Sequence, residues 1–181
     1  MRPSILLVLG LLLSSGLTLS ERPETSTSVV GGTFRERQLV HSELAQFMEL
    51  GLELPILEVK LHQDPAPCNG NSGTFSSHTS PWVVNLCRID GWVARHELGH
   101  AWTAWNLNDS DRDRSLMKWQ LESWASNDTP WRLRGSEHAA DIIAWGLARH
   151  PLGCYSADGP IAARVAAFRD LVVIEPPRIA C

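Results

Sequence analysis

The stretch His96-Glu97-Leu98-Gly99-His100 holds the residues best suited to chemistry in this chain. On a helix, two histidines four positions apart have Cβ atoms about 5–6 Å from each other, so both imidazoles can reach one metal ion. Glu97 would then project beside the same ion, where its carboxylate can take a proton from a zinc-bound water. The H-E-x-x-H pattern therefore predicts a zinc site on a helix, although two histidines unrelated to any metal would give the same letters.

The residues around this pattern predict the helix that it requires. Apolar residues recur at helical spacing and form one stripe, made of Ala94, Leu98, Ala101, Trp102 and Trp105. The two histidines share another face with Trp92 and Thr103, and we expect that face to line a cleft.

A third metal ligand is expected from a second helix, over residues 135–147. Glu137 and Asp141 lie four residues apart and share one face of it. A buried unpaired carboxylate is costly, and a metal ion would give Glu137 a partner. Asp141 could accept the second ring N–H of a metal-bound histidine. Two alternatives remain: both acids lie near a helix start, where negative charge is favourable, and the adjacent His138 could replace Glu137 as the ligand. We favour Glu137, because only this choice places Asp141 on the metal side.

The paired motifs His96-Glu97-x-x-His100 and Glu137-x-x-Ala140-Asp141 resemble those of the gluzincin group of zinc metallopeptidases. In that group two histidines and a downstream glutamate bind zinc, and an aspartate four residues later supports a histidine. The resemblance covers residues 92–145 and implies a zincin-like fold with hydrolytic activity. It implies that His96, His100 and Glu137 bind one Zn²⁺ ion, that Glu97 is the general base and that Asp141 supports a ligand.

Hydrolysis also needs a donor for the negative oxygen that develops beside the metal. Four residues have side chains that could donate, namely Arg134, His138, His150 and Tyr155. No spacing pattern selects among them.

The length and charge of the chain narrow its class. With 181 residues, of which 44% are hydrophobic, we expect one domain with a real core over residues 34–181. The net charge of −4 argues against nucleic acid as a partner. Residues 1–20 are typical of a secretory signal peptide, because Arg2 precedes an apolar run and a small-residue cleavage site. We therefore expect a secreted or extracytoplasmic protein without stable membrane insertion after the signal is cleaved.

Four cysteines follow the signal, at Cys68, Cys87, Cys154 and Cys181. An even count in an exported chain predicts two disulfide bonds. Of the three pairings, we favour Cys68–Cys87 with Cys154–Cys181, because each closes a local loop. Each loop would stabilise the fold by about 3 kcal/mol in the chain-entropy model.

Helices other than the two motif helices are expected at three places. A polar leader, 21–33, is expected to be flexible, and a helix follows it with Thr33 as its cap and Gly51 at its end. Another helix is expected to start at Ser110 or Asp111, and a last one to span 160–172.

Strands are expected near 55–62, 74–76 and 81–86, where apolar and β-branched residues alternate or cluster between turn residues. They predict a small, mostly antiparallel sheet packed on the H-E-x-x-H helix, in which an edge strand beside the metal could hold an extended peptide. The expected fold class is therefore α+β and predominantly helical.

These features predict a secreted zinc-dependent peptidase that acts on a peptide or protein substrate. Two other functions fit the same residues: a non-catalytic secreted domain with zinc-binding or interaction roles, and a zinc amidase acting on cell-wall material. Glu97 favours catalysis, because a purely structural zinc site does not require a carboxylate at that position.

Overall fold

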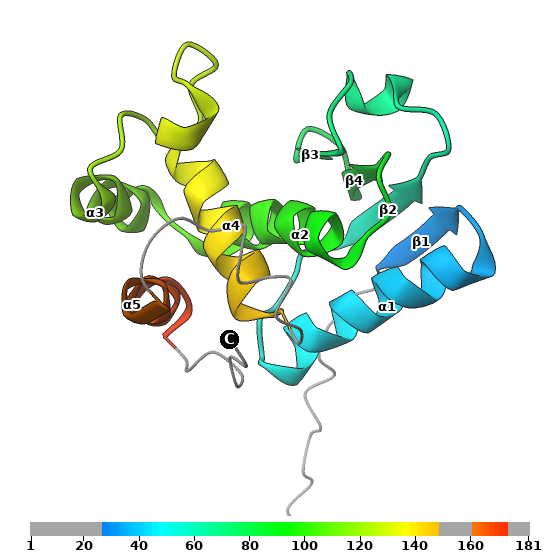
Figure 1. Ribbon diagram of the computed structural model, residues 1–181, viewed down its shortest axis with the longest axis horizontal. Coiled ribbons are helices and arrows are strands. Elements are labelled where there is room, and N and C mark those ends of the chain that lie inside the picture. The colour runs from blue at the N-terminus through cyan, green and yellow to red at the C-terminus, as the bar shows by residue number, and fades with distance from the viewer. Residues whose placement is uncertain (1–26, 149–160, 174–181) are drawn as a thin grey trace, which may run out of the picture.

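The computed structural model describes residues 27–148 and 161–173 and has an α+β fold in which helices predominate (Figure 1). In chain order the elements are β1 (Ser28–Gly31), α1 (Phe34–Glu49), β2 (Leu57–Leu61), the 3-10 helix η1 (Ala66–Cys68), β3 (Gly73–Ser76), β4 (Trp82–Leu86), α2 (Gly91–Asn106), α3 (Asp109–Trp119), the 3-10 helix η2 (Trp131–Leu133), α4 (Gly135–Gly146) and α5 (Ile161–Val172). The expected signal segment lies outside the described residues.

The sheet is mixed, so the prediction of a mostly antiparallel sheet is wrong. Its strand order is β1-β2-β4-β3, with β1 and β4 parallel to β2 and only β3 antiparallel to β4. The apolar pattern of a strand shows which face is buried, but it carries no information on the direction of a neighbour. After β2 the chain reverses direction into β3 and reverses again into β4. Strand β4 is therefore parallel to β2 and antiparallel to β3.

Residues 28–31 form strand β1, where the sequence predicted part of a flexible leader. The strand is mostly exposed and gains its order from backbone pairing with β2. Gly31 and Gly32, with φ values of 78° and 56°, turn the chain directly into α1. A Cβ on Gly31 would lie 2.5 Å from the Leu61 carbonyl oxygen, so this turn accepts only glycine there.

Helix α1 begins and ends as its sequence predicts. The Thr33 hydroxyl accepts a hydrogen bond from the Glu36 N–H, and the Glu36 carboxylate accepts one from the Thr33 N–H. After the helix, Gly51 adopts a φ of 69°, which favours glycine. Val40 and Phe47 on the inner face are fully buried.

Helix α2 is the central element of the fold (Figure 1). The Asp90 carboxylate caps it by accepting from the Val93 N–H at 2.9 Å. The apolar stripe of α2 is buried as predicted, with one exception: Trp105 in the last turn is 57% exposed. Helix α2 contacts the sheet on one side and α4 on the other, and α5 packs behind α4.

The backbones of α2 and α4 approach closely where they cross. A Cβ added to Gly99 would lie 3.1 Å from Ala140 Cα and 3.2 Å from the Ala140 carbonyl oxygen. A buried ion pair supports the same crossing, because Arg95 Nη1 lies 2.9 Å from the Glu43 carboxylate of α1 and Arg95 Nε donates to the Ala144 carbonyl at 3.0 Å. Three helices are thus joined beside the crossing.

Helix α4 begins at Gly135, at the start of the range predicted from the sequence, and has no side-chain cap. Backbone carbonyls take the role of the cap: the Gly135 N–H donates to Ser123 O and the Ser136 N–H to Trp124 O, both at 2.8 Å. Helix α3 begins at Asp109, one residue before Ser110, the earlier of the two predicted starts, with Asn108 as its cap.

The predicted Cys68–Cys87 disulfide is present and ties η1 to the end of β4. Cys154 and Cys181 lie outside the described residues. Among the described helices, none combines the length and the apolar character that crossing a membrane requires.

The close crossing of α2 and α4 can be tested by an alanine-to-valine pair. Ala140→Val adds two methyl groups against Gly99, and we expect overpacking to lower the free energy of unfolding by about 1–3 kcal/mol. The matched control is Ala163→Val on the exposed face of α5, which we expect to cost about 0.5 kcal/mol through helix propensity alone. Urea or thermal unfolding measures both, and equal effects would contradict the close crossing.

Candidate metal centre

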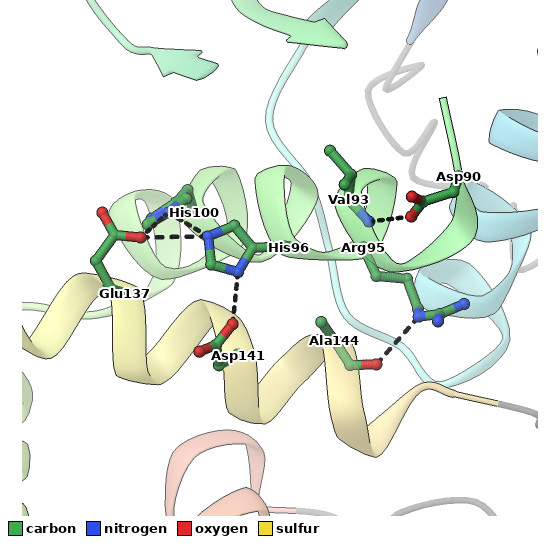
Figure 2. Close-up of polar contacts among 8 residues, drawn as sticks. All are labelled: Asp90, Val93, Arg95, His96, His100, Glu137, Asp141 and Ala144. Atoms are coloured by element: carbon green, nitrogen blue, oxygen red, sulfur yellow. Dashed lines mark hydrogen bonds and ion pairs between the residues drawn. The ribbon is translucent and has the colours of Figure 1, made fainter. Parts of the chain in front are cut away.

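Three side chains from two helices converge on one point (Figure 2). His96 and His100 extend from successive turns of α2, and Glu137 reaches toward them from the first turn of α4. Glu137 Oε2 lies 3.2 Å from His96 Nε2 and 3.1 Å from His100 Nε2, and the two nitrogens are 3.1 Å apart. The three atoms form a nearly equilateral triangle.

This triangle has the dimensions of three corners of a metal coordination tetrahedron. Zinc bonds of about 2.0–2.2 Å in tetrahedral geometry place ligand atoms about 3.3–3.6 Å apart, within a few tenths of an ångström of the observed separations. Within the described residues, this is the one group of histidine, cysteine and acidic side chains close enough to hold a metal ion. His96, His100 and Glu137 could therefore hold a divalent cation together.

His138 is not part of this group, so of the two third ligands considered from the sequence only Glu137 lies with the two histidines. Its ring packs at 4.6 Å from the Trp119 ring of α3, away from the histidines of α2. The rotation of α4 that directs Glu137 to the histidines directs its neighbour to α3.

Asp141 lies one turn along α4 from Glu137 and orients the first histidine (Figure 2). Its Oδ1 accepts a hydrogen bond from His96 Nδ1 at 2.8 Å. This contact keeps a proton on Nδ1 and directs Nε2 toward the other two donors, as in carboxylate–histidine–metal arrangements.

The charges of the group favour a cation between the donors. Burial lowers the pKa of His96, but the hydrogen bonds of Asp141 and then Glu137 outweigh it and raise this pKa to about 10. Burial would raise the pKa of Glu137, yet its contacts with His100 and His96 bring it well below its usual range. The carboxylates thus stabilise positive charge at the place where a metal ion would bind.

Glu97 lies beside the group with its carboxylate against the backbone of β3. The residue is 6% exposed, and burial raises the pKa of its carboxyl group. A Cβ on Gly73 would lie 2.7 Å from both Glu97 Cγ and Glu97 Oε1. Only glycine at position 73 leaves space for the carboxylate in this position, and no feature of the sequence pointed to that constraint.

The three donors and Glu97 open into a cavity of about 840 Å³. Helix α2 forms its floor, β3 one wall, and the segment between α3 and α4 the opposite wall. Arg134 is the predicted oxyanion donor that lines this cavity, but its guanidinium already donates to the Thr129 and Asn127 carbonyls. His138 does not line the cavity, and His150 and Tyr155 lie outside the described residues.

Strand β3 presents backbone groups to this cavity. The Cys87 N–H donates to Ser72 O at 2.9 Å, and the antiparallel register continues with Gly73 opposite Leu86 and Phe75 opposite Val84. Residues that exchange hydrogen bonds with the partner strand alternate with residues whose N–H and C=O point the other way. Gly73 and Phe75 therefore direct these groups to the free edge, which no described strand covers.

Aromatic rings flank both imidazoles, which the sequence did not reveal. The Phe75 ring of β3 is stacked on His100, with centroids 6.5 Å apart and an interplanar angle of 6°. The Trp131 ring of η2 is stacked on His96 at 6.2 Å and 21°. The contact partners come from segments far apart in the chain, so local periodicity could not identify them.

No protein-family model, no curated protein and no solved structure matches this chain. The resemblance to gluzincins therefore stays a prediction from the two motifs.

Measurements of zinc affinity test the role of Asp141 and the choice of Glu137 over His138 as the third ligand. Asp141→Asn keeps the shape of the side chain but removes the negative charge at His96, and we expect zinc affinity to fall about 10–100-fold. His138→Ala is the control, because its ring lies against Trp119, and we expect unchanged affinity. Competition with a fluorescent zinc chelator measures both. A larger loss for His138→Ala would contradict the site.

Proposed function

We propose that this protein is a zinc-dependent peptidase that hydrolyses peptide bonds in the cavity above α2. The observation that carries this proposal is the position of Glu97, which lies buried beside the three donors and against a strand with a free edge. A structural metal site would not require this carboxylate, nor an open cavity beside its ligands. The zincin-like fold implied by the motifs belongs to the same proposal.

Metal binding, ligand orientation and proton transfer are assigned to different residues in this proposal. Zinc, when bound, polarises the scissile carbonyl and lowers the pKa of water. His96, His100 and Glu137 hold the ion, and Asp141 fixes the orientation of His96. Glu97 accepts the proton of the attacking water and transfers it to the leaving amine.

The edge of β3 supports a polypeptide as the substrate. The N–H and C=O groups of Gly73 and Phe75 lie along the cavity and can pair with an extended chain as an added strand. Because Gly73 also contacts Glu97, this pairing would bring the backbone of the substrate beside the general base.

The proposal includes a secreted or extracytoplasmic location. The Cys68–Cys87 disulfide supports it, because such bonds persist in oxidising compartments. The apolar run of residues 1–20 supports it from the sequence.

The role of Glu97 is tested by Glu97→Gln. This variant keeps the three donors, so we expect zinc binding to persist, while hydrolysis of a peptide library falls by about 10²–10⁴-fold. Glu122→Gln, an exposed acid outside the cavity, is the control and should retain full activity. Cell-wall fragments form a parallel substrate arm. Retained peptide hydrolysis in Glu97→Gln would remove the proposed general base, and cleavage of cell-wall fragments alone would favour an amidase.

A second variant tests the position of the Glu97 carboxylate without changing Glu97 itself. Gly73→Ala places a methyl group where Glu97 lies, so we expect the carboxylate to be displaced and hydrolysis to fall while zinc binding persists. Ser76→Ala, at the other end of β3, is the control for changes in the strand.

A further inference from the structure

Two of the eight tryptophans expose most of their surface to solvent. Trp105 is 57% exposed and Trp131 53% exposed, whereas the other six are buried or partly buried. A large apolar ring left in water next to a cavity is typical of a binding surface. Trp131 lines the cavity, whereas Trp105 does not. The apolar stripe predicted for the H-E-x-x-H helix includes Trp105, and no pattern in the sequence points to Trp131.

Both exposed rings connect to the metal centre through a row of ring contacts. On one side, Trp131 is stacked on His96, whose ring lies 4.7 Å from that of His100. On the other side, Phe75 is stacked on His100, Trp82 contacts Phe75 edge-on at 5.6 Å, and Trp105 contacts Trp82 at 5.6 Å. We call these six rings the aromatic row. Two of the three metal donors, His96 and His100, belong to it, and an exposed indole ends it on each side.

The other exposed apolar side chains do not share this arrangement. Phe34, 71% exposed, starts α1, and Met117 lies on α3, and neither lines the cavity.

A polypeptide is the occupant that fits the cavity beside Trp131. The free edge of β3 lies along this cavity, with the N–H and C=O groups of Gly73 and Phe75 available for backbone pairing. A chain paired with β3 therefore passes between this edge and Trp131, which lies on the opposite wall.

We propose that Trp131 is a specificity-determining residue that binds a bulky apolar side chain of a polypeptide substrate close to the cleaved bond. This inference rests on the proposed peptidase function. The Trp131 ring lines the cavity and is stacked on the ring of the candidate ligand His96, with centroids 6.2 Å apart, which places the indole close to the reacting groups.

Peptide binding to the zinc-loaded Glu97→Gln protein tests the proposed role of Trp131 without hydrolysis of the peptide. The probes are serine- and glycine-based peptides about ten residues long, each with one phenylalanine placed at successive positions on either side of the bond that the wild-type protein cleaves. We expect Trp131→Ala to weaken binding about tenfold for phenylalanine close to the bond on one side. Trp105→Ala is the matched control, because it removes an exposed indole that does not line the cavity, and it should leave all affinities unchanged.

The controls separate ring binding from general damage. Phe34→Ala removes an exposed ring outside the cavity and should leave all affinities unchanged. Because Trp131 contacts a metal ligand, zinc content is measured for each variant, and Trp131→Phe keeps a ring over His96 while reducing the apolar contact. We expect a several-fold loss for that variant.

The outcomes distinguish this inference from the peptidase proposal. Equal losses in Trp131→Ala for peptides with and without phenylalanine, in a protein that cleaves peptides, would overturn the role of Trp131 and leave the peptidase proposal standing. Neither cleavage by the wild-type protein nor binding by Glu97→Gln would overturn both. Binding of cell-wall glycan strands in place of peptides, lost in Trp131→Ala, would overturn the polypeptide assignment.

Discussion

The contact between Gly99 on α2 and Ala140 on α4 is the constraint on which the candidate metal centre depends. Each residue lies inside one of the two motifs, between side chains that converge on the neighbouring helix. Glycine and alanine let the two backbones approach closely, so that short side chains such as those of Asp141 and Glu137 span the remaining distance to His96 and His100. A larger residue at either position would move all of these contacts apart.

Other parts of the fold support this crossing from outside. The buried Arg95–Glu43 ion pair joins α1 to α2, and the Arg95 contact with the Ala144 carbonyl extends the connection to α4. On the opposite face of α2, Gly73 of β3 leaves the space that Glu97 occupies. The disulfide at Cys68 and Cys87 restrains the loop that leads into this strand. The reactive side chains are thus held from both sides of one helix.

Much of the candidate site could be predicted from sequence because its candidate ligands lie on helices, where spacing determines which residues share a face. The four-residue intervals from His96 to His100 and from Glu137 to Asp141 are local, and so is the cap at Thr33. The choice of Glu137 over His138 followed from the same periodicity, since only one of two adjacent residues can face α2.

The features that the sequence did not reveal depend on contacts between distant segments. Strand β1 forms because β2 offers an edge to pair with, and the direction of β2 relative to β4 follows from the path of the loop between them. Trp105 has the spacing of a core residue, but it lies in the last turn of α2, where it meets Trp82 and remains mostly exposed. The position of Trp131 over His96 depends on a segment without helical or strand periodicity.

X-ray absorption at the zinc edge of the purified, zinc-loaded protein tests the central claim most directly, because it counts and identifies the atoms around the ion. The account predicts one zinc ion per chain with two imidazole nitrogens and a shell of oxygen atoms at about 2.0–2.2 Å, and loss of one nitrogen in His100→Ala. A sulfur shell, a third imidazole, or an unchanged spectrum in His100→Ala would contradict the convergence of His96, His100 and Glu137 on one ion.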